Sequence, residues 1–282
     1  MALGFSACGA LIIGFNQWAQ VDGRRLVVLR VAGVVPLALV MMAFLPWPHA
    51  AMFYAVAAMM GLGLAYSDML LFDAAAAHGG RLTALYVPIK MLVGFMLWVV
   101  ADPVSVWPLW LEPWRGAAVA AGFVLCGGAL LSLRRIDASW EALTAVLPVA
   151  LLLAVGDVVA KDALEPVGQG PAWQEVCGRA VVFLLTTSLS GALLMAVAGV
   201  RFRPHRGEVV KGVLLGLILL PSLCLFLVTL AWAPNPGYVA AISMLSALWL
   251  ALWGYFRRGE HNNWWAGLAM IAGALVVGLA GR

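Results

Sequence analysis

The chain contains, from Val209 to Trp232, the stretch VVKGVLLGLILLPSLCLFLVTLAW, in which Lys211 is the one charged side chain. A helix of about 20 mainly apolar residues is long enough to cross the hydrocarbon core of a bilayer. In hydrocarbon the backbone can satisfy its hydrogen bonds only as a helix or a closed barrel, and an unbroken apolar run lacks the alternation of a barrel strand. This stretch is therefore predicted to be a transmembrane helix.

The composition extends this prediction to the whole chain. Of 282 residues, 64% are hydrophobic and 11% are charged, whereas a soluble domain carries roughly 25% charged residues. We expect an all-α integral membrane protein that crosses the cytoplasmic membrane several times. The net charge of +4 resides in short loops, as membrane orientation requires, so nucleic acid is not an expected partner. The opening MALGFSACGALIIGF has no basic residue and is expected to be a retained first helix.

Apolar runs separated by short polar breaks predict ten helices. Five precede the Arg134-Arg135 break and five follow it, which predicts two five-helix units, 1–135 and 136–282. The expected spans are 2–20, 27–45, 50–75, 82–101, 115–133, 140–162, 177–199, 209–232, 237–256 and 264–281.

An internal match supports two repeats. WRGAAVAAG at 114–122 can be laid over WAGLAMIAG at 265–273, and Gly116, Gly122 and Gly127 then fall on three glycines at a constant offset. Because each unit has an odd number of helices, the two insert with opposite orientation, which is the inverted-repeat plan of many carriers. The alternative is that Gly- and Ala-rich membrane helices simply look alike.

The C-terminal stretch carries a family resemblance. It reads PNPGYVAAISMLSALW at 234–249, then Gly259-Glu260, then WAGL at 265–268. The chain resembles the ten-helix drug/metabolite transporters built from two EamA-type repeats, in their ninth helix, Gly-Glu turn and tenth helix. GFNQW at 14–18 is similar to that family's first helix, and GDVVAK at 156–161 has the same place in the second half. The 80–133 region departs from the pattern, with Asp102-Pro and Glu112-Pro where a Gly-Glu turn would stand. The resemblance implies transport, with the substrate cavity lined by the first and sixth helices.

Basic residues predict the orientation. Twelve of the seventeen Lys and Arg residues lie in the odd-numbered loops and adjoining helix ends, and only four lie on the other side. The positive-inside rule then places the odd loops in the cytoplasm and both termini outside. The resemblance implies the reverse, with both termini inside. The size of the charge bias favours termini outside.

Charged residues at membrane depth are the main site candidates, because a charge in hydrocarbon is costly and needs a reason. Lys90 lies about 12 Å into its helix at 1.5 Å per residue, and Asp68 is expected at similar depth in the preceding helix. We expect these two to pair, either as a wall of a substrate cavity or as an ion pair that only joins two helices. Asp157 is the third candidate, with Lys161 one turn along, and the alternative for these two is an interfacial contact.

Uncharged groups complete the predicted site. Asn16 and Gln17 are expected to supply hydrogen bonds, or to join helices. Ser243 is a weaker candidate, as are Ser222 and Ser246, because a membrane serine commonly bonds its own helix. Pro36, Pro88, Pro148 and Pro221 are expected to bend four even-numbered helices. The glycines of the fifth and tenth helices predict close helix contact, and with it a possible homodimer.

These features favour a secondary transporter that moves a small polar or amphipathic, amino-acid-like metabolite by alternating access. A lipid-linked or polyprenyl-linked substrate, and a non-transporting membrane scaffold subunit, are the alternatives. No HExxH, GxSxG or Walker motif is present, so we expect neither an enzyme nor a metal or other cofactor. The four cysteines are expected to act as small packing residues. The expected partners are the substrate and membrane lipids.

Overall fold

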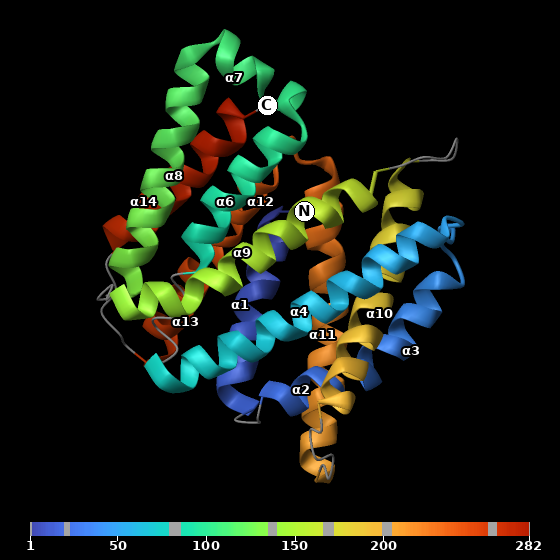
Figure 1. Cartoon of the computed structure of the whole chain (residues 1–282). Coiled ribbons are helices and arrows are strands. Elements are labelled where there is room, and N and C mark those ends of the chain that lie inside the picture. The colour runs from blue at the N-terminus through green and yellow to red at the C-terminus, as the bar shows by residue number, and fades with distance from the viewer. Residues whose placement is uncertain are drawn as a thin grey trace.

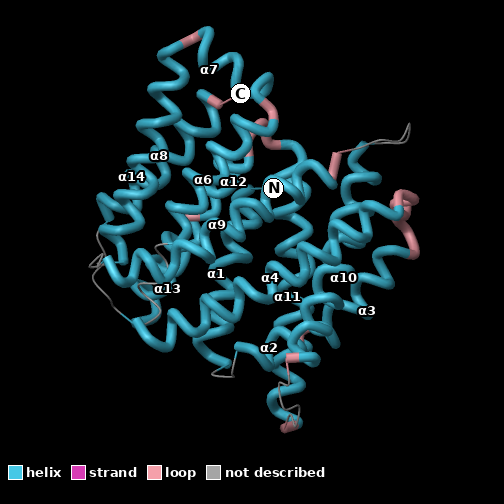
Figure 2. The backbone as a smooth tube through the Cα atoms, viewed as in Figure 1, coloured by secondary structure: helices cyan, strands magenta, loops and turns pink. Residues whose placement is uncertain are grey.

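The computed structural model describes residues 2–19, 23–78, 86–134, 140–165, 172–198, 205–258 and 264–281. Within these ranges all regular elements are helical, which confirms the all-α prediction (Figures 1 and 2). The elements are α1 (Ala2–Ala19), α2 (Gly23–Leu29), α3 (Val31–Met42), α4 (Ala51–His78), α6 (Tyr86–Ala101), the 3-10 helix η1 (Pro103–Val106), α7 (Trp107–Leu111), α8 (Pro113–Arg134), α9 (Trp140–Ala163), α10 (Ala172–Val197), α11 (Arg206–Trp232), α12 (Pro236–Ser243), α13 (Leu245–Arg258) and α14 (Trp264–Ala280).

Several of these helices are long and apolar enough to cross a bilayer. Among the described residues there are five such segments, and a sixth if α6 and the bent η1–α7 segment count as one span. The chain is thus consistent with a membrane-embedded protein, while the full set of ten spans stays a prediction. The five segments are Arg24–Met42, Ala51–Leu70, Pro113–Ser132, Ala172–Val197 and Arg206–Trp232.

The helices pack around two large apolar cores, and a third, small cluster contains Val27, Ala65 and Met195. One core is formed mainly by α3, α4, α9, α10 and α11, and includes Phe53 and Phe183. The other is formed by α6, α8, α12, α13 and α14, and includes Met91 and Met270. Helix α6 packs on α9, and α1 packs on both α11 and α13, so these contacts join the two cores. Several buried polar residues lie on elements that border the seam between the cores, among them Asp157, Lys161 and Asn235.

The chain turns sharply after α6. The helix ends at Ala101, and η1 and α7 leave it at 114°. Asp102 precedes a proline, and its backbone (φ −135°, ψ 78°) lies outside the α region, which a following proline disfavours. Its side-chain oxygen also accepts a hydrogen bond from the Ser105 N–H at 3.4 Å. The Asp102-Pro and Glu112-Pro pairs thus end one helix and begin the next.

Prolines occupy helix interiors at three of the four predicted positions. Pro36, Pro148 and Pro221 lie inside α3, α9 and α11. Pro88 is the third residue of α6 as described, and residues 79–85 before it lie outside the described structure. The interruption of this helix by Pro88 therefore stays a prediction.

Several helix crossings depend on glycine, including α3 with α11 and α8 with α14. A Cβ added at Gly33 of α3 would overlap the Val213 carbonyl oxygen and lie 3.0 Å from the Cα of Gly216 in α11. A Cβ added at Gly122 of α8 would lie 2.9 Å from the Gly273 carbonyl oxygen of α14. The predicted close contact of α8 and α14 is therefore made within one chain, and the homodimer stays a prediction that these two glycines no longer support.

The two ends of the molecule differ in side-chain chemistry. In Figure 1, α2 and the first turn of α11 lie at the lower end, and α7 lies at the upper end. Arg24, Arg25 and Arg206 belong to the lower elements, whereas Trp107 and Trp110 belong to α7. Arg25 pairs with Glu208 at 3.4 Å. Basic residues gather on the cytoplasmic side of membrane proteins and tryptophans lie at both membrane interfaces, so the chemistry of these two ends is consistent with a membrane-embedded protein.

Candidate functional site

In the described part of the chain, the ion pair with the least exposed side chains joins α6 to α9. The Lys90 Nζ lies 2.8 Å from an Asp157 carboxylate oxygen, and the two side chains are 16% and 11% exposed. Lys90 lies next to Met91 of one apolar core, and Asp157 lies one turn before Ala160 of the other. The pair therefore spans the seam between the cores, and both of its members were predicted site residues.

The predicted Asp68–Lys90 pair is wrong. Asp68 of α4 instead lies 3.3 Å from Arg30 Nη2, at the junction of α2 and α3. The error came from the assumption that helices joined by a short loop pack together. Helix α6 packs mainly on α9 and α12, and α4 packs on α9 and α10. Asp68 is thus separated from the seam and compensated by a different cation.

Aromatic side chains cover the ion pair. The Lys90 Nζ lies 5.4 Å from the centroid of the Phe226 ring in α11, a distance at which a cation is attracted to the ring. Phe226 in turn contacts Phe5 of α1, with ring centroids 4.8 Å apart. Residues of α1, α6, α9 and α11 therefore converge here. Sequence reasoning missed Phe226, because a phenylalanine in an apolar run carries no distinguishing signal.

Lys161 does not form the predicted contact with Asp157. Its Nζ donates to the carbonyl oxygen of Ala233 at 2.6 Å, and to those of Leu230 and Ala231 at 3.4 Å each. It also lies 4.9 Å from the centroid of the Trp98 ring. The last carbonyls of a helix have no intrahelical partner and carry partial negative charge. Lys161 therefore caps the C-terminal end of α11.

Arg179 of α10 plays the same part for α9. Its Nη1 donates to the carbonyl oxygens of Ala163 and Glu165 at 2.9 and 2.6 Å, and its Nε pairs with Glu175 at 3.4 Å. Lys161 and Arg179 thus each hold the C-terminal end of a helix. This leaves Lys90 as the cation that faces Asp157.

The remaining predicted residues have mixed outcomes. Ser243 donates to the Ala240 carbonyl of its own helix at 2.6 Å, the ordinary back-bonding arrangement. Asn16 and Gln17 belong to α1, but their side chains lie outside the described part of the structure. Ser222 is fully buried, and its hydroxyl has no hydrogen-bond partner.

Two further polar groups near the seam were not predicted. Asn235 accepts a hydrogen bond from the Gly237 N–H at 2.8 Å, which begins α12, and it donates to the Phe95 carbonyl at 3.4 Å. The Trp98 indole N–H is buried and unpartnered. Among the described residues no three His, Cys, Asp or Glu side chains are grouped as a metal site would require. The four cysteines are free.

Comparisons with known proteins support the fold alone. The sequence matches no protein-family model and no curated protein. A solved structure described as "Crystal structure of protein" is similar along 100% of this chain and 97% of its own, with a TM-score of 0.67 and 15% identity. The arrangement of helices is therefore one that an experimental structure also adopts.

Proposed function

We propose that this protein is a secondary transporter of the drug/metabolite type, and that the Lys90–Asp157 pair is the centre of its substrate site. The observation that carries the proposal is the position of this pair, 2.8 Å apart in the seam between two apolar cores. A charged side chain at the centre of a membrane helix costs at least about 2.5 kcal/mol, and such groups commonly mark substrate or ion pathways.

Stability alone is a weak reason for such a pair. The desolvation of two charges offsets most of their attraction, and replacing a buried ion pair by apolar residues is often neutral or stabilising by ~1–4 kcal/mol. A transporter has a different use for the pair, because a substrate can exchange its own charges for those of the protein. Lys90 would receive a substrate carboxylate and Asp157 a substrate ammonium. This pairing favours a zwitterion, such as an amino acid.

The packing of the helices supports two repeats and alternating access. The contact of α3 with α11 has a counterpart in the contact of α10 with α4, with the two halves exchanged. Both crossings are close at glycine. Gly33 faces Gly216 in the first, and a Cβ added at Gly191 would lie 3.2 Å from the Gly61 carbonyl oxygen in the second. Matched crossings of this kind are what inverted repeats produce, and repeats of this kind rock against each other around a central site.

The test is exchange of labelled amino acids across vesicles that contain the purified protein. We expect saturable exchange of at least one common L-amino acid by the wild type. The variants Lys90→Met, Asp157→Asn and the double variant should all lose this exchange, because each removes a group that the substrate contacts. Asp68→Asn is the matched control, since it removes a carboxylate from a different semi-buried ion pair. It should keep exchange.

Two results would contradict the proposal. If the double variant exchanges amino acids normally and has the thermal stability of the wild type, the pair is a purely structural contact. Absence of exchange for every amino acid in the panel would remove the zwitterion assignment.

A further inference from the structure

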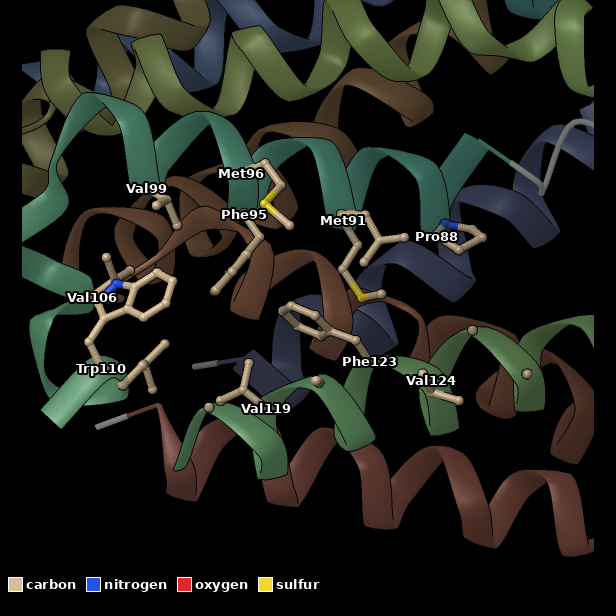
Figure 3. Close-up of a pocket in the computed structure, with 16 residues that line it drawn as sticks. Pro88, Met91, Phe95, Met96, Val99, Val106, Trp110, Val119, Phe123 and Val124 are labelled. Carbon is tan, nitrogen blue, oxygen red and sulfur yellow. The ribbon is translucent and has the colours of Figure 1, made fainter. Parts of the chain in front are cut away.

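A long apolar groove lies on the opposite side of α6 from the ion pair. It has a volume of about 530 Å³ and is bordered by α6, α7 and α8 (Figure 3). Pro88, Met91 and Phe95 of α6 line one wall, and Phe123 of α8 lines the other. In Figure 3, Trp110 lies at one end of the groove and Pro88 at the other.

The groove exists because α8 offers small side chains to α6. Gly116, Ala120, Gly127 and Gly128 line it, and a Cβ added at Gly128 would meet no atom within 4 Å. Helix α8 makes its extensive contact with α14 instead. Of the lining residues, Trp110 alone carries a nitrogen or oxygen in its side chain. An occupant of this groove is therefore held by apolar contact rather than by hydrogen bonds.

The helices that border the groove indicate that it faces lipid. Pro113–Ser132 of α8 is long and apolar enough to span a bilayer, and α6 with α7 qualifies as a bent span. Leu92, Met96 and Val124 line the groove and are exposed on these helices. The groove therefore opens sideways, toward hydrocarbon rather than water.

The length of the groove and the tryptophans at one end favour an acyl chain as its occupant. From Gly116 to Gly128 the groove follows twelve residues of α8, or about 18 Å at 1.5 Å per residue. One leaflet of the hydrocarbon core is about 15 Å deep, half of its ~30 Å thickness. Trp110, and the exposed Trp107 and Trp114 beside it, are suited to the membrane interface, where indoles gather. The groove thus begins at headgroup level and has the depth of one leaflet, whereas a helix of a second copy would cross both.

We propose that one acyl chain of a bilayer phospholipid occupies this groove, with its headgroup at the level of α7. The site is separate from the Lys90–Asp157 pair and does not depend on the transport proposal. The bound chain completes the packing between α6 and α8.

Photocrosslinking tests this assignment. The protein is placed in phosphatidylglycerol vesicles containing a phosphatidylcholine with a photoreactive group midway along one acyl chain, and adducts are mapped by mass spectrometry. We expect adducts concentrated on Met91, Met96 and Val124. Gly128→Phe fills the groove and should lower these adducts about tenfold, since overpacking of this size opposes binding. Ala120→Phe provides a second, independent block.

Gly278→Phe is the matched control, because a Cβ added at Gly278 of α14 also meets no atom within 4 Å but this residue lies outside the groove. It should leave the adducts unchanged. Adducts no denser in the groove than on the exposed Leu275 of α14 would overturn the proposal. Adducts that persist in both folded blocking variants would do the same, as would crosslinks between two copies of the chain through Met96.

Discussion

At the scale of single residues, the lysines of the seam separate into two roles. Lys90 faces a carboxylate, whereas Lys161 is held by three carbonyl oxygens of another helix end. Both lie in apolar helices, and nothing in their local sequence distinguishes them. The difference arises from what each side chain meets across the helix interface.

The role of Lys161 gives a stability prediction. Lys161→Met keeps the length of the side chain but removes the donor, and it leaves buried carbonyls at the end of α11 without a partner. Such a loss costs about 1–3 kcal/mol, which corresponds to a fall in Tm of roughly 2–5 °C for a chain of this size. Thermal unfolding in detergent measures this. Lys161→Arg, which keeps the charge and donors, should lose less, and an unchanged Tm in Lys161→Met would disprove the capping role.

The site could be predicted from the sequence only in part. Depth along a helix and the cost of a buried charge identified both Lys90 and Asp157. Their pairing could not be found this way, because it depends on which helices are neighbours. Asp68 shows the limit, since its depth matched that of Lys90 but its helix faces Arg30. Phe226 and Trp98 carried no signal, because aromatic residues are common in membrane helices.

At the scale of elements, hydropathy predicted the positions of the long helices. It did not predict the short helices whose position depends on prolines and capping residues. The spans 209–232 and 115–133 agree with α11 and α8 within a few residues. The 102–114 loop, in contrast, contains η1 and α7, set at 114° to α6. The short apolar segment between Pro103 and Pro113 contains too few residues for a periodic pattern to reveal a helix. Local capping by Asp102 determines it instead.

The glycine crossings give a prediction about elements. Gly33→Ala would place a methyl group against the backbone of α11, and an overpacked contact costs about 1–3 kcal/mol. Gly63→Ala in α4 is the matched control, because a Cβ added there meets no atom within 4 Å. It should be neutral or stabilising by about 0.4–1 kcal/mol. Denaturant titration of both variants in detergent compares them, and equal stabilities would show that the α3–α11 crossing does not require glycine.

At the scale of the whole molecule, the sequence indicated a helical membrane protein with two similar halves. The composition indicated this class, because so few charges cannot cover a soluble surface. The constant offset between the glycines of 114–122 and 265–273 located a crossing, since Gly122 and Gly273 meet in the structure. The offset does not say which helix each glycine contacts. The sequence therefore also allowed these glycines to meet between two protomers, which led to the homodimer prediction.

The orientation of the molecule in the membrane gives the last prediction. Twelve of the seventeen basic residues belong to the odd-numbered loops and their helix ends, and α7 places its tryptophans at the opposite end of the molecule (Figure 1). A cytoplasmic reporter fused after Arg135 should therefore be active, and one fused after Arg282 inactive. Fusion after Arg258 should agree with Arg135, and fusion after Asp102 with Arg282. Activity at Arg282 and Asp102, with none at the two odd-loop positions, would reverse the orientation and show that the tryptophan-rich end, with the headgroup of the proposed groove lipid, faces the cytoplasm.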